Sequence, residues 1–251
     1  MRQATICPNS TERSTDRAVS TGSLSRSPCS GGPVRACASR ATARARSARS
    51  NESCTRWSPP SVNIATRVRV CVFCGSSDGD APRYREIAAI VGRTIAARSA
   101  RLGYGGGRAG CLGALAAGAL AAGGDVVGVI PSDLVTREVA HAGLQTLHVV
   151  GSMHERKALM AAESDAFLAL PGGFGTLEEL FEVVTWRQLG FHDKPIAILN
   201  VDGYYDALLQ FCNRARDAGF IRKADRAEVR DGTDPVATVD DLLSRVRPRE
   251  P

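Results

Sequence analysis

The hydrophobic positions of this chain change their pattern at about residue 67. Beyond that point, short runs of Val, Ile, Leu and Phe are separated by longer mixed segments. The short runs predict strands over residues 68–73, 102–104, 126–130, 147–150, 166–170 and 196–200. The longer segments are amphipathic or rich in Ala, and they predict helices over residues 84–98, 111–122, 155–162, 177–188, 204–218 and 238–245.

The alternation of strands and helices predicts the fold class. Strands that are apolar throughout and alternate with helices are typical of a parallel sheet that is covered on both faces. We therefore expect an α/β, Rossmann-like, doubly wound domain over residues 66–251. Its mostly parallel sheet should have about six to seven strands flanked by helices.

Residues 1–65 do not share this pattern. They are rich in Ser, Thr, Arg, Ala and Gly and contain few large aliphatic residues, a composition that predicts disorder. Three interpretations stay open: an organelle transit peptide, a basic tail that touches anionic partners, and an upstream reading frame translated from a misassigned start. Arg outnumbers Lys by 29 to 3 over the chain, as a GC-rich coding sequence would give, and this favours the third.

The net charge separates the two parts of the chain. Residues 1–65 contain ten Arg, no Lys and three acidic residues, a net charge of +7. Because the whole chain carries +6, residues 66–251 carry −1. A nucleic-acid-binding function would therefore depend on the Arg-rich front segment, and for the predicted domain we expect no nucleic-acid partner.

The cysteines and the hydropathy indicate the compartment. Eight Cys show no spacing of a disulfide framework, and the Cys71–Cys74 pair lies in an apolar run, where packing as small hydrophobic residues is the simpler interpretation than a redox or zinc site. No stretch approaches the roughly 18 apolar residues that span a bilayer. We expect a cytoplasmic protein without membrane contact.

Three glycine-rich turns follow predicted strands. One contains Gly75 and Ser76, the second covers residues 105–110 and includes Gly106, and the third covers residues 171–179. Carboxyl ends of parallel strands meet at one edge of the sheet, and each turn leads into a helix, an arrangement that suits a phosphate. A single glycine turn can be only a tight connection, but three at one edge favour a nucleotide site.

Two familiar nucleotide motifs do not fit these turns. The third turn lacks the Lys of a Walker A loop, so hydrolysis of a nucleoside triphosphate is not expected. The GGGxxG spacing of the second turn resembles a dinucleotide motif, but Asp125 precedes the next strand and so lies at the wrong end of the sheet to bind a ribose. We therefore expect no dinucleotide cofactor.

Charged residues accompany two of the predicted helix starts. Glu178 and Glu179 are adjacent and point about 100° apart on a helix, so we expect one to face the ligand edge and the other to cap the helix. The segment 153–157 places four ionisable residues after a strand; a solvated face is the alternative interpretation.

Seven motifs together resemble the LONELY GUY (LOG) family of cytokinin riboside 5′-monophosphate phosphoribohydrolases, once described as lysine decarboxylase-like. The resemblance extends from about Val70 to Leu243. It depends on CVFCGSS from Cys71, YGGG from Tyr104, GVIP from Gly128, MHERK from Met153, PGGFGTLEE from Pro171, TWRQLG from Thr185 and NVDGYYD from Asn200. One departure is Ser99, which stands where the family commonly has a helix-ending Gly.

The resemblance implies an enzyme that hydrolyses the N-glycosidic bond of cytokinin riboside 5′-monophosphates, such as isopentenyl-AMP, or of AMP. It implies Arg156 and Glu179 as catalytic residues, no cofactor or metal, and a homodimer. The expected substrate contacts are Glu138, Lys157, Gly172, Gly173, Phe174, Gly175, Thr176, Leu177, Glu178 and Thr185, together with Gly75, Ser76 and Gly106 on the other glycine turns. The alternative function is a non-catalytic carrier of a nucleotide or of a molybdopterin-type cofactor.

Overall fold

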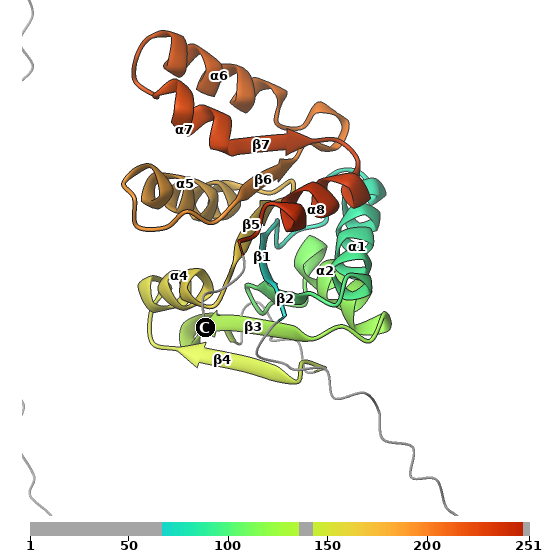
Figure 1. Cartoon of the computed structure of the whole chain (residues 1–251). Helices are drawn as coiled ribbons and strands as arrows, with labels where there is room; N and C mark the ends of the chain where they lie inside the picture. The colour runs from blue at the N-terminus through green and yellow to red at the C-terminus, as the bar shows by residue number, and fades with distance from the viewer. Residues whose placement is uncertain (1–66, 136–142, 248–251) are drawn as a thin grey trace, which may run out of the picture. The chain divides into compact units, whose positions relative to one another are not determined.

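The described part of the chain forms a sheet of seven strands, all parallel (Figure 1). The computed structural model describes residues 67–135 and 143–247, so the expectations for residues 1–65 and for Glu138 lie outside the described residues. The strands are β1 (Arg69–Phe73), β2 (Arg101–Tyr104), β3 (Val126–Pro131), β4 (Thr146–Val150), β5 (Ala166–Ala169), β6 (Ile196–Leu199) and β7 (Val229–Gly232). Their spatial order is β4-β3-β2-β1-β5-β6-β7.

The helices cover both faces of this sheet. They are α1 (Pro82–Ala97), α2 (Gly110–Ala121), α3 (Ser132–Val135), α4 (Met153–Ala162), α5 (Phe174–Gln188), α6 (Asp206–Asp217), α7 (Lys223–Glu228) and α8 (Pro235–Ser244). Figure 1 shows α1, α2 and α8 on one side of the sheet, with α4 and α5 on the other. The expected Rossmann-like, doubly wound α/β fold is confirmed.

Two apolar cores follow from the alternation of side chains along each strand. In β1, Val70 and Val72 face the core that α1, α2 and α8 complete, whereas Cys71 and Phe73 face the core beneath α4, α5 and α6. Every strand from β1 to β6 except β2 and β4 is buried along nearly its whole length. Burial on both faces explains the continuous apolar runs in the sequence.

The order in which successive strands are added to the sheet reverses at β1. Strands β2, β3 and β4 extend to one side of β1, and β5, β6 and β7 extend to the other. The carboxyl ends of β1 and β5, which are direct neighbours, therefore form the switch point at which doubly wound folds bind their ligands.

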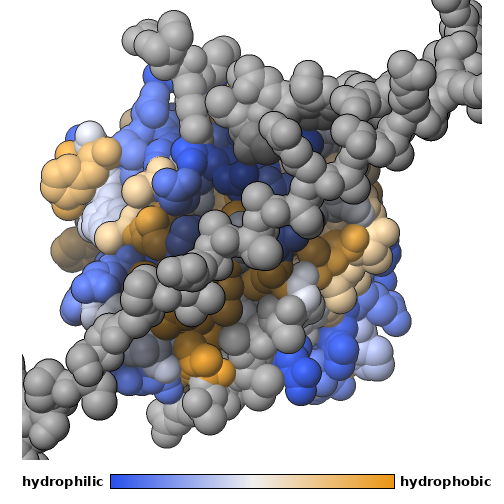
Figure 2. All heavy atoms as spheres, turned by 90° about the horizontal axis from the view of Figure 1, so that it is seen from below, coloured by the Kyte–Doolittle hydropathy of each residue, from blue (hydrophilic) through white to orange (hydrophobic). Residues whose placement is uncertain are grey.

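The strand β7 and the short helices α3 and α7 were not located by the sequence pattern. The four residues of β7, Val-Arg-Asp-Gly, are mostly polar because the strand lies at the sheet edge, where β6 is its one partner strand among the described residues. The opposite edge is β4. Figure 2 views the molecule from the β4 side and shows hydrophobic and hydrophilic surface next to each other.

Several helices begin earlier than the periodicity predicts. Helix α4 begins at Met153, because the Ser152 hydroxyl accepts a hydrogen bond from the Glu155 amide at 3.1 Å while the Glu155 carboxylate accepts one from the Gly151 amide at 2.8 Å. Helix α8 begins at Pro235, with Asp234 as its N-cap. Polar first turns are invisible to a pattern of apolar positions.

No helix among the described residues is both long and apolar enough to cross a membrane.

Ser99 ends α1 in a left-handed conformation. Its φ is +57°, and two hydrogen bonds close the turn, from Ser99 N–H to Ala96 O (2.9 Å) and from Ala100 N–H to Ile95 O (3.1 Å). This pattern is a Schellman motif, whose left-handed residue is usually Gly because a Cβ is strained there.

We expect Ser99→Gly to raise the free energy of unfolding by about 1 kcal/mol, because it removes that strain from an exposed position. Denaturant unfolding measures the change. The matched control is Ala97→Gly, two residues earlier and also exposed, which should lower stability because Gly is unfavourable in a regular helix. Equal effects of the two substitutions would contradict this account of the turn.

Candidate active site

A cleft of about 330 Å³ lies at the carboxyl ends of β1, β2 and β5. All three glycine-rich turns contribute to it, as their sequence positions predict. The lining residues are Val72, Cys74, Gly75, Ser76, Ser77, Gly105, Leu112, Leu134, Met153, Arg156, Gly173, Phe174, Gly175, Thr176, Glu178 and Glu179. This is the position at which the reversal of the strand order favours a ligand.

The N-terminus of α5 forms one wall of the cleft. Gly173 is its N-cap residue and carries no side chain, and no other side chain in the described residues caps the helix. The first amide N–H groups of α5 therefore have no side-chain acceptor, and the helix dipole adds partial positive charge there. Thr176 in this turn is buried and brings a hydroxyl to the same wall. The wall has the chemistry of an anion site.

Backbone contact between two turns fixes the floor of the cleft. The Gly75 amide donates to Pro171 O at 3.1 Å. A Cβ on Gly172 would overlap the Thr176 hydroxyl and lie 2.8 Å from the Gly75 nitrogen. Only Gly fits at position 172, so its role in this structure is to let the β1 and β5 turns meet.

Arg156 and Glu179 form a buried pair between α4 and α5. Their side chains are 7% and 11% exposed, and Arg156 Nη2 lies 3.8 Å from Glu179 Oε1. Arg156 Nη2 also donates to Gly105 O at 3.2 Å, at a position where a Cβ on Gly105 would overlap the guanidinium. Arg156 Nε is buried and has no hydrogen-bond partner among the described residues. A guanidinium held in this way presents a fixed positive charge to the cleft.

Lys157 does not reach into this cleft but joins α4 to α5. Its ammonium group contacts the Glu178 carboxylate and lies 3.0 Å from Glu182 Oε1. The hydrogen bond to Glu178 and the pairing with Glu182 raise the pKa of Lys157 despite its partial burial. The expectation that one of the two adjacent glutamates caps α5 is wrong, because Glu178 pairs with Lys157 and both Glu178 and Glu179 border the cleft.

Besides Lys157 and Gly172, three expected substrate contacts do not line the cleft in the single chain. Leu177 packs against the core beneath α5. Thr185 donates its hydroxyl to Phe181 O at 2.6 Å and borders a separate apolar groove of about 220 Å³ next to α6. Gly106, with φ of +79°, backs onto Leu147 and Ile130, and its neighbour Gly105 borders the cleft instead.

Sequence reasoning missed several residues of the cleft wall. These are Val72, Cys74, Ser77, Gly105, Leu112, Leu134 and Met153. Met153 and Gly105 lie within motifs that were identified, so their positions could have been inferred. Leu112 and Leu134 carry no chemical signal, because an apolar residue in a cleft wall resembles one in a core.

The cysteines behave as small hydrophobic residues. Cys71 and Cys74 are buried in the two different cores, and burial raises the pKa of both thiols above the ordinary range. They face opposite sides of the sheet and do not form a dithiol pair. In the described ranges no group of three or more His, Cys, Asp or Glu side chains is arranged to hold a metal ion.

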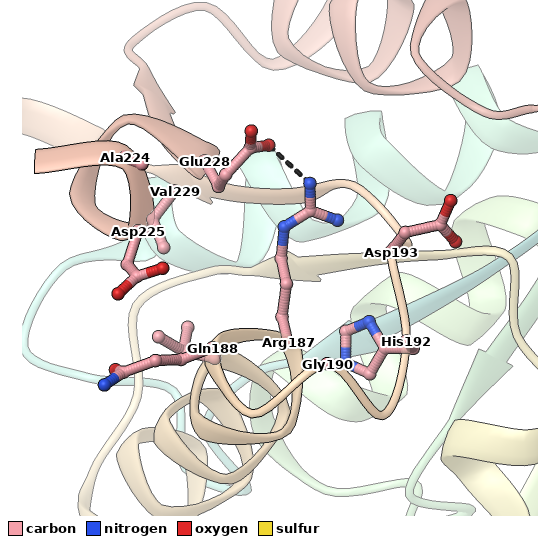
Figure 3. Close-up of a pocket in the computed structure, with 10 residues that line it drawn as sticks. Arg187, Gln188, Gly190, His192, Asp193, Ala224, Asp225, Glu228 and Val229 are labelled. Carbon is pink, nitrogen blue, oxygen red and sulfur yellow. Dashed lines mark hydrogen bonds and ion pairs between the residues drawn. The ribbon is translucent and has the colours of Figure 1, made fainter. Parts of the chain in front are cut away.

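A larger depression of about 540 Å³ lies elsewhere, between the C-terminal end of α5 and α7 (Figure 3). The Arg187 side chain extends across it. Its guanidinium forms an ion pair with Glu228 and donates a hydrogen bond to the Lys194 carbonyl at 2.7 Å. His192 contacts Val183 O at 3.0 Å through Nε2 and accepts the Lys194 amide at Nδ1, and burial lowers its pKa. The Arg187 guanidinium and the His192 ring are thus held by contacts within the protein, and of their polar atoms only Arg187 Nε is buried without a hydrogen-bond partner among the described residues. The smaller cleft, which holds all three glycine turns and the Arg156–Glu179 pair, is the candidate active site.

Comparison with known proteins agrees with these motifs. A family model described as possible lysine decarboxylase matches residues 112–242. The chain is 53% identical over 158 residues to probable cytokinin riboside 5′-monophosphate phosphoribohydrolase LOGL9 of Oryza sativa subsp. japonica, covering 63% of this chain and 70% of that protein. It is 51% identical over 153 residues to cytokinin riboside 5′-monophosphate phosphoribohydrolase LOG7 of Arabidopsis thaliana, covering 61% and 70%.

The covered share of such plant relatives varies from 62% to 72% of their length. Among solved structures, the molybdenum cofactor carrier protein of Chlamydomonas reinhardtii has the same fold, with a TM-score of 0.55, 22% identity, and coverage of 71% of this chain and 99% of that one. At this identity the likeness concerns the fold alone. By its sequence matches and by its motifs, the chain belongs to the LONELY GUY (LOG) family of cytokinin riboside 5′-monophosphate phosphoribohydrolases.

Proposed function

We propose that this protein hydrolyses the N-glycosidic bond of cytokinin riboside 5′-monophosphates or AMP and releases the free base and ribose 5-phosphate. One observation carries the proposal: the buried Arg156–Glu179 pair lies in the same cleft as the uncapped N-terminus of α5. The names of the plant relatives support it.

The phosphate binds to the N-terminus of α5 in this proposal. The amides of Gly173, Phe174 and Gly175 and the hydroxyl of Thr176 supply donors, and Ser76 supplies another from the β1 turn. The phosphate does not react, so its binding energy can position the ribose.

Glu179 and Arg156 act on the sugar. Cleavage builds positive charge on the ribose, and a carboxylate beside C1′ stabilises that charge and orients the attacking water. The water oxygen bonds to C1′ as the C1′–N bond breaks; the base nitrogen leaves with the bonding pair and takes up the proton that the water loses. A guanidinium suits binding and orientation by its charge and its fixed donors, so the role of Arg156 in this proposal is to bind and orient and not to transfer protons.

The lysines argue against decarboxylation of lysine. An enzyme of that kind binds its cofactor through a lysine whose pKa is depressed. Lys157 has a raised pKa between two carboxylates, and Lys194 donates to Ala161 O at 2.6 Å. Lys223 is exposed at the start of α7. A carrier function is also less supported, because it needs no buried arginine–carboxylate pair at the sugar.

We also infer a cytoplasmic homodimer. Cys71, Cys74, Cys111 and Cys212 are free, as in a reducing compartment. Phe181 on α5 is exposed and lines the 220 Å³ groove, and Leu189 and Phe191, which follow α5 in the chain, are also exposed. Apolar surface gathered around a groove favours a second copy as the partner.

The function is tested by incubating the full chain with AMP, with isopentenyl-AMP and with adenosine, and by separating the products by chromatography. We expect adenine or isopentenyladenine and ribose 5-phosphate from the two nucleotides. Adenosine should react at least about tenfold more slowly, because it lacks the group that binds α5. Equal rates for AMP and adenosine would remove the phosphate site from the mechanism, and no base release from either nucleotide would refute the function.

The role of Glu179 is tested by Glu179→Gln, which keeps the size of the side chain and removes its charge. We expect kcat to fall by about 10²- to 10⁴-fold while AMP still binds, since the phosphate donors are unchanged. Glu163→Gln is the matched control, because Glu163 is exposed at the end of α4 and pairs with Arg69 away from the cleft. Near-normal turnover in Glu179→Gln would contradict the assignment.

The dimer is tested by sedimentation of the full chain. We expect twice the mass of one chain, and we expect Phe181→Arg to shift the equilibrium toward single chains because it puts a charge into an apolar interface. A single-chain mass for the unmodified protein at all concentrations would overturn this inference.

A further inference from the structure

The segment Asn200–Asp206 carries a motif that the proposed function leaves without a role. It follows β6 and forms a tight turn that includes the 3₁₀ segment Val201–Gly203, with Asp202 at φ +48° and Gly203 at φ +78°. The Asn200 side chain holds the turn closed: its Oδ1 accepts the Tyr205 amide at 2.7 Å, and its Nδ2 donates to Asp206 Oδ1 at 2.7 Å. The turn is therefore rigid and places two consecutive tyrosines.

Both tyrosine hydroxyls hold the loop between β5 and α5. Tyr204 Oη donates to Gly172 O at 2.8 Å, and Tyr205 Oη donates to Leu170 O at 2.6 Å. The two rings meet edge to face with centroids 4.9 Å apart, and Tyr84 of α1 meets the ring of Tyr204 in the same way at 5.8 Å. The loop that leads into the proposed phosphate site is thus supported from the β6 side.

The geometry of a trans peptide gives the Tyr204 contact a consequence for the cleft. The C=O and N–H of one peptide unit point in opposite directions. Because Gly172 O points to Tyr204, the Gly173 N–H points away from Tyr204. Gly173 borders the cleft and Tyr204 does not. The two glycines that flank this peptide lack side chains and so restrict its rotation less than other residues would, and the hydrogen bond from Tyr204 opposes that rotation.

We propose that Tyr204 is a positioning residue: its hydroxyl holds the Gly172–Gly173 peptide so that the Gly173 N–H faces the phosphate of the substrate. This inference rests on the proposed function. Tyr204 touches no substrate atom and acts through the peptide alone. Its neighbour Tyr205 differs, because it is 2% exposed and belongs to the core, whereas Tyr204 is 45% exposed and can lose its hydroxyl without leaving a cavity.

The test is Tyr204→Phe, which keeps the ring and its aromatic contacts and removes only the donor. We expect KM for AMP to rise about three- to tenfold, the worth of one hydrogen bond, with kcat within about twofold. The Kd of ribose 5-phosphate, measured by calorimetry, should rise by the same factor. Inhibition by free adenine, which has no phosphate, should not change.

Tyr84→Phe is the matched control. Its ring lies in the same aromatic group, and its hydroxyl makes no hydrogen bond within the described part of the chain, so ribose 5-phosphate should bind it as it binds the unmodified protein. Unchanged ribose 5-phosphate affinity in Tyr204→Phe would overturn the proposal, as would an equal loss in Tyr84→Phe. An unmodified protein that binds ribose 5-phosphate but does not cleave AMP would refute the hydrolase function separately. One that cleaves AMP but binds no ribose 5-phosphate would overturn the role of Tyr204 and leave the hydrolase function standing.

Discussion

The backbone contact between the β1 turn and the β5 turn is the constraint on which the rest of the site depends. The Gly75 amide reaches Pro171 O only because Gly172 has no side chain. This contact brings the start of α5 over the end of β1, where the strand order reverses. The wall that we propose as the phosphate site is consequently a product of topology as much as of residue type.

A close approach to a glycine also positions the charged pair of Arg156 and Glu179. Arg156 reaches the cleft through the core side of α4, and Gly105 leaves the space that its guanidinium occupies. Burying this charge is costly, and the Glu179 carboxylate and the Gly105 carbonyl offset that cost. A glycine turn in this protein thus accommodates an arginine, which explains why a glycine turn and a charged motif occur together in this cleft.

The fold and the centre of the site could be predicted because their signals are local. Apolar runs identified six strands, and glycine turns after three of them indicated one edge of the sheet. Other features depend on neighbours that are distant in sequence. The partner of Glu178 is Lys157, 21 residues away, so no local rule distinguishes it from a helix cap. Leu177 lies in the PGGFGTLEE motif but packs against the core, since the first turn of α5 presents some side chains to the cleft and others to the core.

The polar sequence of β7 has a consequence for the sheet as a whole. Its exposed backbone groups could pair with a strand of another molecule, and edges of this kind promote aggregation. Arg230 and Asp231 interrupt that edge with charge, and they are engaged by Asp241 and Arg226. The charged residues that hid this strand from a pattern of apolar positions are thus also residues of the kind that oppose further strand pairing at a sheet edge.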